Sequence, residues 1–243
     1  MTEKDAFLEQ VRDDKGQIER YTWLKSTLEP LAQYFRGKHV LDFGSSYGLS
    51  TCALLEHGAA RVTGVEPDPK RVERGRHVLE ATGWSRAATV QHVADTRRLP
   101  FPDASFDVVL ANAVFEHIPQ PRHEYLREVW RLLKPGGLLI INETPNKYLP
   151  KDIHTTGLWF LNWLPREVAR RYAMLMGRYP KDESWEYSGW RGAGFWELAA
   201  SLPGYELIHE TSRPRHRLLR RLGLPASLLD PYPTWLFRKK QQV

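Results

Sequence analysis

The sequence predicts a doubly wound α/β fold, with a parallel sheet covered by helices on both faces. Short apolar runs alternate with longer amphipathic stretches, which is typical of repeated strand–helix–strand units. The runs at 108–110 and 138–141 are apolar at every position, as expected of buried parallel strands. The Lys-Pro-Gly-Gly sequence at 134–137 predicts a turn from a helix into a strand, because proline ends helices and glycine tolerates a positive φ.

This alternation places the elements in chain order. The expected strands are His39–Phe43, Arg61–Glu66, Ala88–Val93, Phe106–Leu110, Leu138–Asn142, Tyr205–Glu210 and Thr234–Lys239. The expected helices of the regular part are Gln17–Phe35, Leu49–Glu56, Pro69–Ala81, Arg122–Leu133 and Phe195–Ala200. The helix before the first strand is expected to lie over the sheet edge or over the ligand side of the sheet.

Residues 144–192 interrupt the alternation, because they contain no clear strand. A structureless loop of this length is uncommon inside a compact domain, so we interpret the segment as an inserted helical cap. Its helices are expected near Gly157–Trp163 and Arg166–Met176, with Pro165 in the first turn of the second. The tryptophans of this cap are expected to form its own core, or to close over a bound acceptor and exclude water.

The 243 residues are enough for one domain with one core and a cap. The expected parts are N-terminal helices at 1–35, a ligand-binding core at 36–143, the helical cap at 144–192, and C-terminal strands with a basic segment at 193–243. The single cysteine, Cys52, excludes an intramolecular disulfide and a cysteine-based zinc site. The charged N-terminus does not resemble a signal peptide, and no apolar run is long enough for a membrane span, so we expect a cytoplasmic protein.

The formal net charge of +6 lies in the C-terminal part of the chain. Residues 1–150 hold 20 basic and 20 acidic side chains, whereas residues 151–243 hold 15 and 9, and 15 minus 9 gives the whole excess. Such a region suits an anionic small molecule, nucleic acid or an anionic membrane surface, although a solvated basic face is the alternative. The basic and apolar segment at 216–224 is interpreted as a helix on the sheet edge or as a peripheral membrane contact.

The first functional motif is a strand that ends in an acid and a glycine-rich turn that opens a helix. Its sequence is Val40-Leu41-Asp42-Phe43-Gly44-Ser45-Ser46-Tyr47-Gly48. A dinucleotide site needs glycine at the third and sixth positions counted from Gly44, where Ser46 and Leu49 stand. Asp42 would repel a pyrophosphate but attract an ammonium group, such as that of S-adenosylmethionine. A purely structural strand–turn–helix is the alternative interpretation.

Two further acids follow expected strands. Glu66, which precedes Pro67, stands 18 residues after Gly48, where doubly wound folds use an acid to accept ribose hydroxyls. Asp95, followed by Thr96, is placed to accept a hydrogen bond from an adenine amino group, although an aspartate there can equally cap a turn.

The loop after the fourth expected strand lies where ligands bind in such sheets. It contains Asn112 and His117, which we expect to line the site, whereas Asp107 near the strand start is expected to be structural.

Taken together, residues 36–143 resemble the class I S-adenosylmethionine-dependent methyltransferases. The resemblance rests on the glycine loop, Glu66, Asp95, the FDVV and EHI sequences and LKPGGLLII, in the order and spacing of that family. It implies a seven-stranded sheet in the order 3-2-1-4-5-7-6 with an antiparallel seventh strand. It also implies that Asp42 and the backbone of Gly44–Gly48 hold the methionine moiety, Glu66 the ribose and Asp95 the adenine. Ser46 replaces a glycine that the family often has, so we expect altered detail in cofactor binding.

The segment 143–157 follows the fifth expected strand on the ligand side, and its Thr-Pro-Asn and His-Thr sequences resemble capped small-molecule methyltransferases. An alcohol acceptor benefits from a base of near-neutral pKa, so His154 is our first candidate and His117 our second. Glu143 and Asp152 are candidates to assist or to bind a metal, but they lack diagnostic spacing, so no metal is assigned. We expect O-methylation of a sugar, glycan, lipid-linked or secondary-metabolite hydroxyl. The alternatives are an RNA methyltransferase, disfavoured because no RNA-binding module is recognisable, and a non-catalytic partner subunit of this fold.

Overall fold

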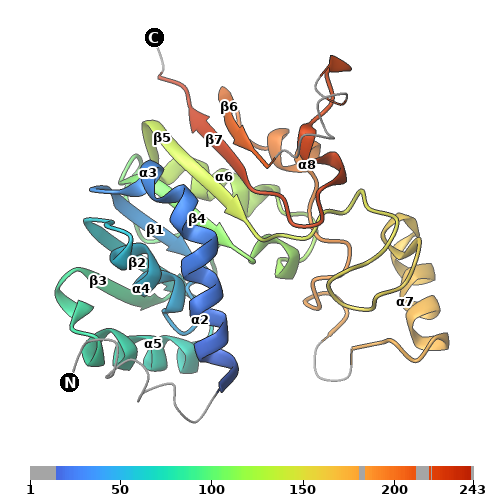
Figure 1. Cartoon of the computed structure of the whole chain (residues 1–243), viewed down its shortest axis with the longest axis horizontal. Coiled ribbons are helices and arrows are strands. Elements are labelled where there is room, and N and C mark those ends of the chain that lie inside the picture. Colours follow the sequence, from blue (N-terminus) through green and yellow to red (C-terminus); the bar gives the residue numbers. More distant parts are fainter. Residues whose placement is uncertain (1–14, 181–183, 212–218, 220, 242–243) are drawn as a thin grey trace. The chain divides into compact units, whose positions relative to one another are not determined.

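In the computed structural model, the chain forms two compact units (Figure 1). The residues that it describes are 15–180, 184–211, 219 and 221–241. The first unit comprises Met1–Leu110 and Arg131–Leu138, and the second comprises Ala111–Trp130 and Leu139–Val243.

Seven strands form a mixed sheet in the order β3-β2-β1-β4-β5-β7-β6. Their bounds are β1 His39–Phe43, β2 Arg61–Glu66, β3 Ala88–His92, β4 Phe106–Asn112, β5 Leu133–Asn142, β6 Tyr205–Glu210 and β7 Trp235–Lys239. β1 pairs in parallel with β2 and β4, and β2 pairs in parallel with β3, whereas β6 and β7 are antiparallel. The strand order and the antiparallel seventh strand confirm the predicted fold.

The strand bounds follow the apolar runs closely. β1, β2 and β6 begin and end at the predicted residues, and β4 continues two residues further than expected, to Asn112. β5 begins at Leu133 rather than Leu138, so the Lys-Pro-Gly-Gly sequence is part of the strand. Gly136 still turns the backbone there, with a φ of +82°. The last five positions of β4 and the last six of β5 are buried, as expected of parallel strands under two layers of helices.

The helices of the first unit cover its strands. α4 (Leu49–Glu56) and α5 (Pro69–Ala81) have the predicted bounds, and α5 lies beside β3 (Figure 1). Asp68 caps α5 by accepting a hydrogen bond from the Lys70 amide at 2.8 Å. Cys52 is buried in α4, and burial raises the pKa of its thiol to about 12.

The N-terminal helix is shorter than predicted. The expected helix over 17–35 divides into α2 (Lys15–Leu28), a 3-10 turn at Glu29–Leu31 and α3 (Ala32–Phe35). Pro30 explains the break, because proline has no amide hydrogen to donate to the preceding turn. α2 packs against α4, where Tyr21 donates a hydrogen bond to Glu56.

Beyond β5 the second unit contains a cap with its own apolar core. The predicted second cap helix is α7 (Arg166–Leu175), whereas the predicted helix over 157–163 is wrong. Only the 3-10 turn Leu161–Trp163 forms there, because Gly157 and Phe160 adopt left-handed φ values of +72° and +60°.

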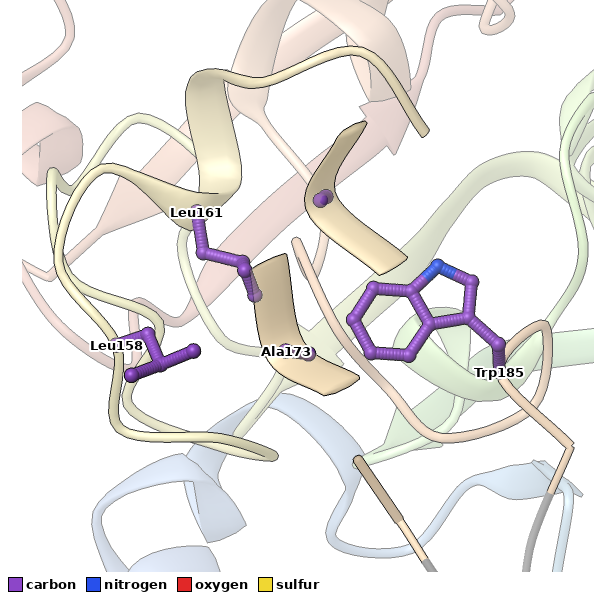
Figure 2. Close-up of a cluster of buried hydrophobic side chains, with 5 residues drawn as sticks. Leu158, Leu161, Ala173 and Trp185 are labelled. Atoms are coloured by element: carbon purple, nitrogen blue, oxygen red, sulfur yellow. The ribbon is translucent and has the colours of Figure 1, made fainter. Parts of the chain in front are cut away.

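The cap core consists of small and large apolar side chains around α7, with the Trp185 ring closing one side (Figure 2). Its buried members are Leu158, Leu161, Ala169, Ala173 and Trp185. The expectation that the cap tryptophans form this core holds for Trp185, which stacks on Trp190 with ring centroids 4.8 Å apart. It is wrong for Trp159 and Trp163, which are 56% and 58% exposed.

The remaining helices are α6 (His123–Leu132) and α8 (Phe195–Ala199), each within two residues of its predicted bounds. Of the basic segment at 216–224, residues 216–218 and 220 lie outside the described residues, as do Arg213 and Arg215 and the N-terminal stretch before residue 15. Among the helices of the described residues, none has the length and apolar character that crossing a membrane requires.

Candidate active site

Asp42 lies near the end of β1 and is only 1% exposed. Its Oδ2 atom accepts hydrogen bonds from the hydroxyls of Ser50 and Thr51, each at 2.7 Å. Burial raises the pKa of Asp42 to about 6, although the two hydroxyls act in the opposite direction. Because both bonds go to Oδ2, the acceptor capacity of Oδ1 is left for another donor.

The glycine loop between β1 and α4 is a tight turn tied to the neighbouring strand. Gly44 and Gly48 both have a φ of +78°, which glycine adopts without steric cost. The amides of Gly44 and Ser45 donate to the carbonyl oxygen of Val65, each at 3.0 Å. A Cβ atom on Gly48 would lie 3.4 Å from the backbone of α5, so glycine permits the close packing that the sequence predicts there.

Ser45 carries a polar group that is buried without a partner. The residue is 1% exposed, and among the described residues no group forms a hydrogen bond with its Oγ atom. A Cβ atom added to Gly64 on β2 would lie 2.7 Å from that oxygen, so the absence of a side chain at Gly64 makes room for the hydroxyl. A buried unpaired hydroxyl is unfavourable, and a bound ligand is one way to satisfy it.

Glu66 holds the glycine loop from the end of β2. Its Oε2 atom accepts a hydrogen bond from the Ser46 amide at 3.0 Å, and its Oε1 atom accepts one from the Asp68 amide at 3.1 Å. Ser46 has a φ of +49°, in the left-handed region that favours glycine. The amide hydrogen of Ser46, the residue that replaces a glycine common in the family, is therefore bonded within the protein.

The remaining residues predicted to bind the cofactor, Asp95, Thr96 and Pro67, lie at or near the surface of the first unit. Asp95 is exposed and binds the guanidinium of Arg97 through both oxygens, at 2.9 Å each, and also accepts the Arg97 amide. These bonds hold the pKa of Asp95 below its usual value. Asp95 thus caps the turn by accepting the Arg97 amide, which is the alternative that the sequence left open. Thr96 is half-buried, and Pro67 is exposed with its carbonyl oxygen 3.1 Å from the Nε2 atom of His92.

In the second unit, Asn112 ends β4 and is buried. Its Oδ1 atom accepts a hydrogen bond from the side-chain amide of Asn142 at 2.7 Å, and Asn142 in turn accepts one from the Thr234 hydroxyl at 2.6 Å. The side chain of Asn112 therefore joins the end of β4 to the end of β5 through a hydrogen bond.

The residues after these two asparagines have strained backbones. Ala113 and Glu143 have φ values of +53° and +58°, which non-glycine residues seldom adopt. Strain of this kind gathers at functional sites. Burial raises the pKa of Glu143 to about 7, and the nearby carboxylate of Glu116 adds to this effect.

Both predicted histidines lie in the second unit and come together. The ring centroids of His117 and His154 are 5.4 Å apart. The Nδ1 atom of His117 is 2.7 Å from the carbonyl oxygen of Tyr187, which can only accept, so Nδ1 carries the proton. His154 is exposed, and its amide donates to Asp152, whose carboxylate also holds Thr156.

Glu116 is the third member of this group. Its Oε2 atom accepts a hydrogen bond from the Thr144 hydroxyl at 3.0 Å, whereas its Oε1 atom is buried and forms no hydrogen bond with any described residue. Burial raises the pKa of Glu116. We call Glu116, His117 and His154 the acid–histidine cluster, because one ligand atom of each lies within 4.8 Å of the others.

Sequence reasoning missed Glu116 as a site residue and considered Glu143 and Asp152 instead. The carboxylate of Asp152 accepts hydrogen bonds from the backbone amides of the turn at 154–156, and the sequence does not reveal these bonds. The available signal was the adjacency of Glu116 to His117 directly after β4, a position where ligands bind in such sheets.

Residues 41–141 match the family model of a methyltransferase domain. An uncharacterized methyltransferase of Mycolicibacterium vanbaalenii is 33% identical over 181 residues, which are 74% of this chain and 65% of the relative. The ubiquinone biosynthesis O-methyltransferase of Maricaulis maris is 31% identical over 144 residues, covering 58% of this chain and 54% of the relative. The chain thus spans about half the length of several curated relatives that it matches.

Solved structures show the same fold at low sequence identity. The crystal structure of a putative sarcosine dimethylglycine methyltransferase from Galdieria sulphuraria superposes with a TM-score of 0.61 at 16% identity, over 93% of this chain and 87% of that one. The family match, the named relatives and the sheet order agree with one another. The findings support a class I S-adenosylmethionine-dependent methyltransferase, with the methyltransferase domain matched over residues 41–141.

Proposed function

We propose that the protein transfers the methyl group of S-adenosylmethionine to a hydroxyl of a small-molecule acceptor, such as a sugar, glycan, lipid-linked compound or secondary metabolite. The observation that carries this proposal is the acid–histidine cluster, which places two imidazoles beside a buried carboxylate. An alcohol must lose a proton as it is methylated, and imidazole is suited to accept one near neutral pH. The name of the Maricaulis relative, an O-methyltransferase, supports the same acceptor class.

The first unit supplies groups that fit the cofactor. The Oδ1 atom of Asp42 would accept a hydrogen bond from the ammonium group of the methionine moiety, and the unpaired hydroxyl of Ser45 would gain a partner in the same moiety. Glu66 uses one acceptor site on Oε2 for the Ser46 amide and one on Oε1 for the Asp68 amide, and each oxygen has a second site for a ribose hydroxyl. Asp95 would accept a hydrogen bond from the adenine amino group in addition to the two that it accepts from the Arg97 guanidinium.

The register of the sheet relates the ends of β1 and β4. β1 and β4 are parallel neighbours, and Asp42 pairs with Leu110. The chain reaches Asn112 two residues later, and Glu116 and His117 follow within the next five. Parallel neighbouring strands end on the same side of a sheet, which is where doubly wound folds bind ligands.

In the proposed reaction, the acceptor oxygen attacks the methyl carbon in line with the sulfur. A carbon–oxygen bond forms, and the carbon–sulfur bond breaks with its electron pair left on the sulfur, which becomes neutral. The proton of the hydroxyl passes to the acid–histidine cluster and then to water. The sulfonium activates the methyl group, so the protein contributes alignment of the two reactants and acceptance of one proton.

The test is incubation of the full chain with isotope-labelled cofactor and a metabolite extract, followed by mass spectrometry of the products. We expect one or more methyl ethers with the label. We expect His154→Ala to bind the cofactor normally but to form product more slowly, whereas His92→Ala, which removes an exposed histidine of the first unit, should retain the full rate.

The competing functions predict different results. Label on nitrogen or carbon, or unchanged turnover by His154→Ala, would contradict the proposed reaction. Tight and strongly salt-dependent RNA binding with labelled RNA would indicate an RNA methyltransferase. A failure to bind S-adenosylmethionine by calorimetry would indicate a non-catalytic subunit.

A further inference from the structure

The acid–histidine cluster has features that neither acid–base chemistry nor cofactor binding uses. The Oε1 atom of Glu116 is buried and, within the described chain, forms no hydrogen bond. The Nε2 atom of His117 lies 3.9 Å from that oxygen, which is too far for a hydrogen bond. A buried carboxylate oxygen that faces an imidazole nitrogen across such a gap is poorly satisfied unless something lies between them.

The gap matches the separation of two ligands of one metal ion. Zinc–nitrogen and zinc–oxygen bonds of about 2.1 Å at a tetrahedral angle place the two ligand atoms roughly 3.4 Å apart. The ligand atoms of Glu116, His117 and His154 all lie within 4.8 Å of one another, so a contraction of at most about 1.4 Å brings the three onto a common ion.

The tautomer of His117 is the one that a metal ligand needs. Its Nδ1–H donates to the carbonyl oxygen of Tyr187 at 2.7 Å, so the lone pair of the neutral ring is on Nε2, the atom that faces Glu116. Metal-bound histidines commonly donate their other N–H to a backbone carbonyl in this way, which fixes the orientation of the ring.

The surroundings hold both rings in place. A Cβ atom added to Gly189 would lie 2.5 Å from Cδ2 of His154 and 3.2 Å from Cε1 of His117, so the missing side chain at Gly189 provides the space for both rings. The hydroxyl of Thr155 donates to the carbonyl oxygen of Ser188 at 2.6 Å and joins the segment of His154 to that of Gly189. The second carboxylate oxygen of Glu116 is fixed by Thr144.

We propose that Glu116, His117 and His154 bind one divalent transition-metal ion. One carboxylate and two imidazoles suit zinc, iron, cobalt and nickel, whereas magnesium and calcium prefer oxygen ligands alone. Three protein ligands leave coordination positions open, as in catalytic rather than structural zinc sites.

The use of this ion in methyl transfer rests on the proposed function. A hydroxyl oxygen of the acceptor bound at an open position becomes more acidic, releases its proton to water and then attacks the methyl carbon. His154 serves as a ligand in this form of the protein, and the loss of His154 should then slow turnover by loss of the ion.

The test is calorimetric titration of the full chain, stripped with a chelator, with zinc chloride in the absence of cofactor and acceptor. We expect one zinc ion per chain, with affinity reduced by about tenfold or more in His117→Asn and in His154→Asn. His92→Asn should bind zinc as the unaltered chain does. Cobalt should give the visible absorption of a low-symmetry site in the unaltered chain and lose it in His154→Asn, a variant at an exposed position that circular dichroism should show to be folded.

No stoichiometric zinc binding, equal binding by all three variants, or tighter binding of magnesium than of zinc would each overturn the proposed site. The experiments distinguish a failure of the proposed metal site from a failure of the proposed methylation of a hydroxyl. Hydroxyl methylation by a chain that binds no zinc would remove the metal site alone, and zinc binding by a chain that methylates no hydroxyl would remove the proposed acceptor class alone.

Discussion

The amide hydrogen of Ser46 points to the side chain of Glu66, and the two residues, 20 positions apart, are joined by a hydrogen bond of 3.0 Å. The same carboxylate also accepts the Asp68 amide at 3.1 Å. Glu66 therefore fixes the conformation of the glycine loop, including the left-handed backbone of Ser46, in addition to any contact with a ribose. The glycine loop and Glu66 therefore form one unit whose conformation depends on both.

Glu66→Gln should weaken this unit. The amide has one acceptor oxygen and one donor nitrogen, so the donor faces either the Ser46 or the Asp68 amide hydrogen, and a buried donor loses its partner. We expect a loss of about 1–3 kcal/mol in the free energy of unfolding, together with weaker cofactor binding. Urea denaturation and calorimetry measure the two effects. Glu73→Gln, at an exposed position of α5, is the matched control, and cofactor affinity that is equal in both variants would refute this role of Glu66.

Cofactor affinity should depend on pH through Asp42. Burial raises the pKa of this residue to about 6, so its carboxyl group becomes neutral below that pH and loses its attraction for the cofactor ammonium. We expect the affinity to rise by up to about tenfold between about pH 5 and pH 7. Calorimetry over this range should give a weak and nearly flat profile for Asp42→Asn. Asp103→Asn, which alters an exposed acid bound to Arg131, should keep the profile of the unaltered chain.

Gly189→Ala should disturb the acid–histidine cluster without altering the cofactor loop. Its new Cβ atom would lie 2.5 Å from the His154 ring, and a displacement of about 1 Å slows an aligned reaction by up to about a hundredfold. Gly177→Ala is a stringent control, because Gly177 also has a positive φ, of +63°, but faces open space. Both variants should lose about 1–2 kcal/mol of stability from backbone strain. Only Gly189→Ala should lose product formation, and an equal loss in both variants would contradict this role of Gly189.

Arg122 should be essential for the stability of the second unit. It is buried, and its guanidinium donates to the carbonyl oxygen of Gly192 at 2.7 Å and to Glu197 at 3.0 Å. Arg122→Met leaves the partly buried Glu197 carboxylate short of one partner and removes a buried donor from the Gly192 carbonyl, so we expect a loss of about 3–5 kcal/mol in the free energy of unfolding. Arg238→Met, which breaks an exposed pair with Glu206, should cost less than about 1 kcal/mol. Thermal denaturation of both variants measures the difference, and similar losses would refute this account.

The interaction of Glu197 with Arg122 also makes the stability of the protein depend on pH, and the sign of this dependence follows from the pKa of Glu197. Burial alone would raise the pKa of Glu197, but Arg122 and Lys147 outweigh this effect and hold the pKa below its usual value of 4.5. A depressed pKa in the folded state stabilises the protein above the unfolded value and ceases to do so as the pH falls through the folded value. Stability of the unaltered chain should therefore decline as the pH falls below about 4.5, and Glu197→Gln should show a smaller decline.

Much of the fold was predictable because strand and helix periodicity are local signals. The bounds of β1, β2, α4 and α5 follow from apolar runs and from the proline and glycine residues that flank them. The prediction of the first cap helix was wrong because Phe160 adopts a left-handed backbone conformation, which interrupts a helix. Phenylalanine has no local preference for that conformation, so the sequence does not indicate it.

The site was predictable only in part, for a different reason. The positions of Asp42, Glu66 and His154 at strand ends and in loops follow from the sequence, and their roles in binding and catalysis stay predictions. The partners of Asp95 and Asp152, and the unpaired oxygen of Glu116, depend on which side chains tertiary structure brings together. Carboxylates of similar chemistry thus differ in availability, because tertiary contacts occupy some of their oxygens and leave others unpaired.

The burial of Cys52 in α4 has a practical consequence for studying motion. The chain has no other thiol, and the raised pKa of this one keeps it protonated and unreactive at neutral pH. Cysteines introduced at exposed positions would accordingly be the reactive thiols, one on each compact unit. Fluorescent or spin labels on such a pair would report how the distance between the units responds to S-adenosylmethionine, in a protein whose native chemistry is left intact.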